Sequence, residues 1–158
     1  MYGHLNNLSA TNNGLKTLSE DAIERKNAMQ TFDRLLSKAR RRRMFGGLVG
    51  RKSTMSRLAD DARHGTPRYE GVRSVSIDQI IGTENRDVEF DGDFLPLEAH
   101  VEQRWVSVAS AFVRGVVLPP LDLIRVGEDY YIRDGHHRVS VYRTFGVGEV
   151  EAEVTTLT

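Results

Sequence analysis

The sequence predicts an α+β fold, in which a small mixed sheet with packed helices is preceded by a long basic amphipathic helix. Two observations carry this prediction. Short apolar runs, typical of strands, occur in residues 72–81, 121–132 and 150–154. Apolar residues recur every three to four positions in residues 19–45 and 101–112, as in helices with one buried face. A chain of 158 residues is long enough for one domain with an appendage.

The chain is expected to begin with a polar arm and a helix. Residues 1–18 are rich in asparagine and sustain no apolar period, so we expect a flexible polar arm. Thr17 and Glu20 have the spacing of a capping box and mark the predicted helix start. The apolar stripe of this helix consists of Ala22, Met29, Phe32, Leu36 and Ala39. The helix is expected to end near Gly46, and residues 19–70 to form a basic helical region and linker.

Basic residues are concentrated in this first part. Residues 1–70 carry 14 Lys or Arg and 7 Asp or Glu, whereas residues 71–158 carry 8 and 15, so that the net charge of the chain is zero. Basic runs are most often solvated faces; an anion-binding surface for a phosphate backbone or an acidic lipid is the alternative. Its candidate contacts are Arg40, Arg41, Arg42, Arg43, Arg51 and Lys52.

The main domain is expected over residues 71–158. It opens with a strand and a short helical turn in residues 72–81, followed by an acidic loop in residues 83–94. Pro96 is expected in the first turn of the next helix, which ends at Gly115 and places Trp105 in the core.

The second half of this domain is expected to be a hairpin, a helix and a strand. Residues 121–132 are predicted to form the hairpin, with a turn at Gly127. Residues 136–145 form the predicted helix, which Gly146 ends, and residues 150–154 alternate as the last strand.

The junction between the hairpin and its helix is the most informative segment. It reads Asp134-Gly135-His136-His137-Arg138. A helix N-terminus has backbone N–H groups without intrahelical partners and carries the positive end of the helix dipole, so it attracts anions. An ordinary turn would also suit aspartate and glycine, but three successive cationic or ionisable donors are more than a turn requires. The junction therefore predicts a phosphate site.

The order of elements over residues 71–155, together with this box, resembles the ParB N-terminal and sulfiredoxin superfamily. The matching box reads Gly-Glu-Arg-Arg in ParB-like proteins and Gly-Cys-His-Arg in sulfiredoxins, and it contacts nucleotide phosphates in both. An Asp-Gly-His-His-Arg box is found in the free serine kinase branch, which is the closest literal match to residues 134–138. The resemblance implies a nucleotide site at the box.

Departures from the family pattern narrow the activities that the resemblance implies. The chain has no cysteine, so sulfiredoxin chemistry, which needs a thiol in the box, is excluded. A complete ParB clamp is not expected, because no helix-turn-helix segment follows the domain. The first ParB box survives only partly, as Glu84-Asn85-Arg86.

The leading hypothesis is that the domain binds a nucleoside di- or triphosphate such as ATP, ADP or CTP. Backbone groups from Gly135 onward would receive phosphate oxygens, Arg138 would add charge-assisted hydrogen bonds, and His136 and His137 would donate or titrate. A Mg²⁺ ion carried with the nucleotide would be held by Asp134, Glu84 or Asp87. If the protein is an enzyme, a nucleotide-dependent phosphotransferase or hydrolase is expected, with Glu84 and His137 as the candidate catalytic residues.

Two alternatives concern the basic region between Lys38 and Arg57. In one, the protein is a non-catalytic module whose basic helix binds nucleic acid through the phosphate backbone. In the other, the basic region pairs with the acidic part of the same or a neighbouring subunit, as in a homo-oligomer.

The composition also predicts the compartment. The absence of cysteine fits a reducing environment, no apolar run is long enough for a transmembrane segment, and the N-terminus lacks the apolar stretch of a signal peptide. We expect a cytoplasmic protein.

Overall fold

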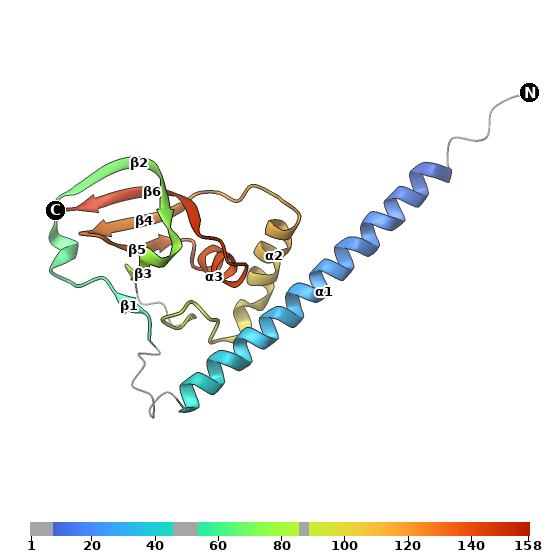
Figure 1. Ribbon diagram of the computed structural model, residues 1–158, viewed down its shortest axis with the longest axis horizontal. Helices are drawn as coiled ribbons and strands as arrows, with labels where there is room; N and C mark the ends of the chain where they lie inside the picture. The colour runs from blue at the N-terminus through green and yellow to red at the C-terminus, as the bar shows by residue number, and fades with distance from the viewer. Residues whose placement is uncertain (1–7, 46–53, 86–88) are drawn as a thin grey trace, which may run out of the picture.

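The computed structural model describes residues 8–45, 54–85 and 89–158, and it shows an α+β fold beside a long N-terminal helix (Figure 1). The helices are α1 Leu8–Phe45, α2 Glu102–Val113 and α3 His136–Thr144, with short 3₁₀ turns η2 Ala62–His64, η3 Ile77–Gln79 and η4 Ala99–Val101. The strands are β1 Ser56–Arg57, β2 Pro67–Ser76, β3 Ile80–Thr83, β4 Leu121–Val126, β5 Asp129–Asp134 and β6 Glu149–Leu157. The predicted fold class is confirmed.

The strands form one mixed sheet in the order β1-β3-β5-β4-β6-β2. The hairpin of β4 and β5 lies at its centre, and β6 pairs in parallel with β4 and antiparallel with β2. Strand β1 and the first residues of β2 come from the segment predicted to be a linker, so the sheet takes strands from both sides of residue 71.

Two apolar clusters hold the layers together. The first fills the space between the sheet and α3, with Leu123, Ile132 and Val139 fully buried. The second joins α1, α2 and α3 around Trp105, which is fully buried as predicted. The Phe32 ring of α1 lies 5.8 Å from the Trp105 ring, and Trp105 Nε1 donates a hydrogen bond of 2.9 Å to Ser140 Oγ of α3. Helix α1 is thus part of the fold and not an attached arm.

The helix start predicted at Thr17 is wrong, because α1 begins at Leu8 and includes most of the predicted polar arm. Once the docked part of a helix is formed, each further residue adds a hydrogen bond without a new nucleation step, so polar turns can extend it. The predicted apolar stripe is only partly buried: Phe32, Leu36 and Ala39 are covered, whereas Met29 is exposed.

The start of α2 also differs from the prediction. Pro96 lies in an antiparallel bridge with Phe90, before η4, and not in the first helical turn. The acidic segment before it is a folded loop: Asp91 is buried, and its Oδ1 accepts hydrogen bonds of 2.9 Å from the backbone N–H groups of Asp93 and Leu95.

The hairpin, its turn at Gly127 and the helix ended by Gly146 are confirmed, and both glycines have positive φ. In the part of the chain that the structure describes, none of the helices is long and apolar enough to cross a membrane.

Candidate functional site

The phosphate site predicted from the sequence falls at the junction of β5 and α3. Strand β5 ends at Asp134, Gly135 has φ of 117° and ψ of 18°, and α3 begins at His136. A Cβ atom built on Gly135 would lie 2.5 Å from Leu121 Cδ2, in the buried core. Both the positive φ and this close approach therefore require glycine. Glycine also has no side chain, so the N-cap position of α3 supplies no side-chain oxygen that could accept hydrogen bonds from the backbone N–H groups of the first turn.

The Arg138 side chain is anchored at this junction. Its Nη1 donates hydrogen bonds of 2.6 and 2.5 Å to the carbonyl oxygens of Pro119 and Pro120, and its Nη2 bonds Asp134 Oδ2 at 2.6 Å. Only 13% of the side chain is exposed. The guanidinium therefore joins the segment before β4 to the box, and it forms one wall of a cavity.

The two histidines of the box have different surroundings. His136 Nε2 lies 2.9 Å from Oγ1 of Thr83, a buried residue at the end of β3. His137 is buried, and its ring packs edge-on against Phe90 at a centroid distance of 5.1 Å. Adjacent helix positions point about 100° apart, which explains why the two rings have separate partners.

A cavity of about 330 Å³ opens in front of the box. It is lined by residues 134–138 of the box and by Glu89, Arg104, Val108, Leu118 and Pro119. Arg104 is exposed on α2, one turn before Val108. Glu89 Oε1 lies 3.0 Å from His100 Nε2. The cavity thus combines a helix N-terminus with two arginines, two histidines and a short apolar wall.

The sequence does not mark Arg104 as a site residue. Its spacing from Val108 shows that the two share a helix face, but only the packing of α2 against α3 brings that face to the box.

The candidate base Glu84 lies elsewhere. Its Oε2 is 3.1 Å from Nε of Arg133, and it does not line the cavity at the box. Arg133 Nη1 is also 3.6 Å from Asp122 Oδ1, and burial raises the pKa of Asp122. The structure therefore does not place Glu84 in the cavity that His137 lines, and among the described residues the carboxylates that line this cavity are Glu89 and Asp134.

Among the described side chains, His, Asp and Glu residues form no group of three that could hold a metal ion. Asp87, named with Glu84 and Asp134 for a Mg²⁺ ion, lies outside the described residues.

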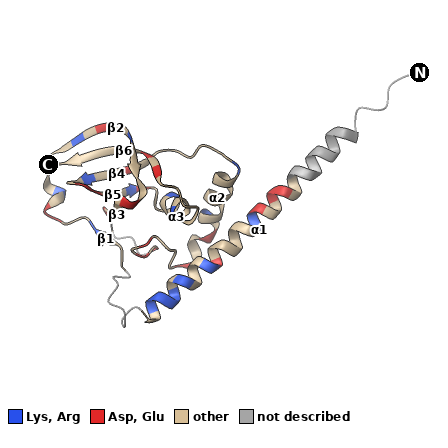
Figure 2. Ribbon diagram, in the orientation of Figure 1, with Lys and Arg blue, Asp and Glu red and all other residues tan. Residues whose placement is uncertain are grey.

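The predicted anion-binding arginines occupy the C-terminal end of α1, where Figure 2 shows basic residues gathered. Arg40, Arg41 and Arg43 are exposed, whereas Arg42 forms an ion pair with Asp93. Arg51 and Lys52 lie outside the described residues.

No protein-family model matches the chain, and no curated protein matches it. Among solved structures, it is similar to sulfiredoxin from Arabidopsis thaliana, with 15% sequence identity and a TM-score of 0.37. The match covers 52% of this chain and 82% of that one. The similarity concerns part of the fold and assigns no activity.

Proposed function

We propose that the cavity at the N-terminus of α3 binds a phosphate-bearing ligand, a nucleoside di- or triphosphate such as ATP, ADP or CTP. The observation that carries this proposal is that Arg104 of α2 lines the same cavity as the Gly135 junction. Backbone N–H groups of a first helical turn attract phosphate oxygens, and a guanidinium in the same cavity adds charge-assisted hydrogen bonds.

The walls of the cavity suit the other parts of a nucleotide. Val108, Leu118 and Pro119 give an apolar surface against which a sugar or a base can pack. The volume of about 330 Å³ is at the lower end of the range for small-molecule sites, roughly 300 to 1,000 Å³. Mg²⁺ bound to nucleotide phosphates needs only one or two protein carboxylates, and Asp134 and Glu89 line this cavity.

Arg138 contributes mainly by shaping the site. Because its guanidinium holds the Pro119 and Pro120 carbonyls and Asp134, it fixes the wall that the ligand would contact. Binding, and not phosphoryl transfer, is the function that this geometry supports. The reason is that Glu84 pairs with Arg133, whereas the cavity carboxylates Glu89 and Asp134 contact His100 and Arg138.

The proposal is tested by calorimetric titration of the protein with ATP, ADP and CTP in the presence of Mg²⁺. The wild type should bind at least one of them at a single site. Arg104→Gln should weaken that binding by roughly tenfold, because one charge-assisted hydrogen bond contributes about 1.5 kcal/mol. Arg73→Gln, on the exposed side of β2 and outside the cavity, is the matched control and should bind like the wild type. Absence of binding by the wild type, or equal affinities of the wild type and Arg104→Gln, would contradict the proposal.

A further inference from the structure

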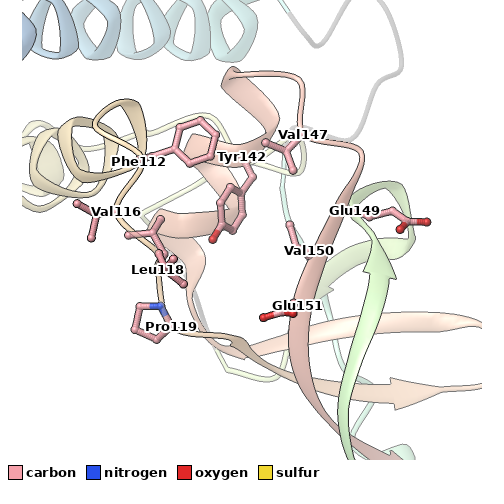
Figure 3. Close-up of a pocket in the computed structure, with 11 residues that line it drawn as sticks. Phe112, Val116, Leu118, Pro119, Tyr142, Val147, Glu149, Val150 and Glu151 are labelled. Atoms are coloured by element: carbon pink, nitrogen blue, oxygen red, sulfur yellow. The ribbon is translucent and has the colours of Figure 1, made fainter.

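A second cavity, here called the apolar groove, lies where α2 ends. It has a volume of about 310 Å³ and lies between the residues that follow α2, one face of α3 and the start of β6 (Figure 3). Figure 3 shows Phe112, Val116, Leu118, Tyr142 and Val150 around it. Val117, which also lines it, is 90% exposed. The groove is therefore an apolar surface that the described part of this chain leaves open to solvent.

Two carboxylates flank the groove. Glu149 and Glu151 alternate with the buried Val150 on β6, so both side chains are on the outer face of the strand. Glu149 Oε2 accepts a hydrogen bond of 2.9 Å from Ser74 Oγ, and Glu151 adds to the rise in the pKa of Tyr142 that burial causes. A partner that fits this surface needs an apolar side chain for the groove and positive charges beside it.

The C-terminal end of α1 has this combination. Met44 and Phe45 are 77% and 62% exposed, although both are large and apolar. Arg40, Arg41 and Arg43, also exposed, lie on the same two turns. Figure 2 shows this end of α1 as the strongly basic part of the helix. Exposed methionine and phenylalanine beside arginine are typical of protein interfaces, whereas phosphate-backbone contact needs only the arginines.

The groove of the same molecule cannot receive this helix end. Asp21 of α1 forms an ion pair of 3.3 Å with Arg114, the residue before Gly115 of the groove. Phe45 lies 24 positions further along the same helix, which corresponds to about 36 Å at 1.5 Å per residue. A helix end at that distance can fill only the groove of another molecule.

We propose that the protein assembles head to tail, with the helix end around Met44 and Phe45 of one copy docked in the apolar groove of a second copy. Arg41 and Arg43 then face Glu149 and Glu151. Each copy uses two different surfaces, so the contact is heterologous and continues from copy to copy until the chain of molecules ends or closes into a ring.

Sedimentation velocity over concentrations from about 1 μM to about 1 mM tests this proposal. The average mass of the wild type should rise with concentration from 17.8 kDa past twice that value. The doubly substituted variants Arg41→Glu/Arg43→Glu and Glu149→Arg/Glu151→Arg should each stay at 17.8 kDa.

In a mixture of the two variants, the charges of the variants complement each other. The acidic helix end of the first variant faces the basic groove of the second, and the basic helix end of the second faces the acidic groove of the first. The mixture should therefore assemble in alternation, although neither variant assembles alone. This recovery also shows that both variants are folded, so loss of assembly in either one is not a folding defect.

Three results would overturn the proposal. The first is a wild type that stays at 17.8 kDa over the whole concentration range. The second is assembly of either variant alone to the same extent as the wild type. The third is a mixture that stays monomeric. If the wild type is monomeric but binds duplex DNA with an affinity that falls steeply with salt and is lost in Arg41→Glu/Arg43→Glu, the helix end is a nucleic-acid surface instead.

Discussion

Gly135→Ala is expected to destabilise the protein far more than alanine at another positive-φ glycine. At φ of 117° a side chain strains the backbone, which costs about 1 to 2 kcal/mol. The new Cβ would also lie 2.5 Å from Leu121 Cδ2, and Leu121 is fully buried, so the core must shift at a cost of about 1 to 3 kcal/mol. The free energy of unfolding should fall by about 2 to 5 kcal/mol in total.

Urea unfolding followed by the fluorescence of Trp105, the one tryptophan of the chain, measures this loss. Gly146→Ala is the matched control, because φ there is 71° and a Cβ would meet nothing within 4 Å. It should cost only the backbone strain, about 1 to 2 kcal/mol. Equal losses for the two variants would refute the argument that the core packs closely against the junction of β5 and α3.

Three further predictions concern the core, the acidic loop and the cavity wall. Ser140→Ala leaves the buried N–H group of Trp105 without its hydrogen-bond acceptor. In the same urea assay, the free energy of unfolding should fall by about 1 to 3 kcal/mol. An unchanged free energy of unfolding would contradict this prediction. Burial raises the pKa of Asp91 above its ordinary value of 3.8, so the folded state binds the proton more tightly than the unfolded state. The stability of the wild type relative to Asp91→Asn should therefore fall as the pH rises from about 4 toward 7, and a relative stability that rises over this range would count against it. Arg138→Gln should lower the free energy of unfolding by about 2 kcal/mol, because the variant loses the three hydrogen bonds of Arg138. Arg104 is exposed, so Arg104→Gln should change the free energy of unfolding by less than about 0.5 kcal/mol in thermal unfolding. Similar losses for both variants would show that Arg138 is not an anchor.

The local elements of the second half could be predicted from the sequence because each is encoded by neighbouring residues. Gly127 and Gly146 mark a turn and a helix end through their positive φ, and the apolar runs between them have clear strand or helix periods. The β5 to α3 junction could be located for the same reason.

Features that depend on packing could not be predicted in this way. Strand β1 has only two residues and is defined by its pairing with β3, not by an apolar pattern. The first turns of α1 have no apolar period, so nothing local marks Leu8 as the helix start. Arg104 lines the cavity at the box, and Glu84 pairs with Arg133, because of how distant elements pack in space.

The most direct test of the nucleotide-binding proposal follows the backbone amide resonances of the protein during titration with a nucleoside triphosphate and Mg²⁺. If the nucleotide binds in this cavity, the largest shifts fall on residues 135–138 and on Arg104, which line it. Saturating shifts confined to other parts of the chain, such as the apolar groove, or no shifts at all, would contradict it.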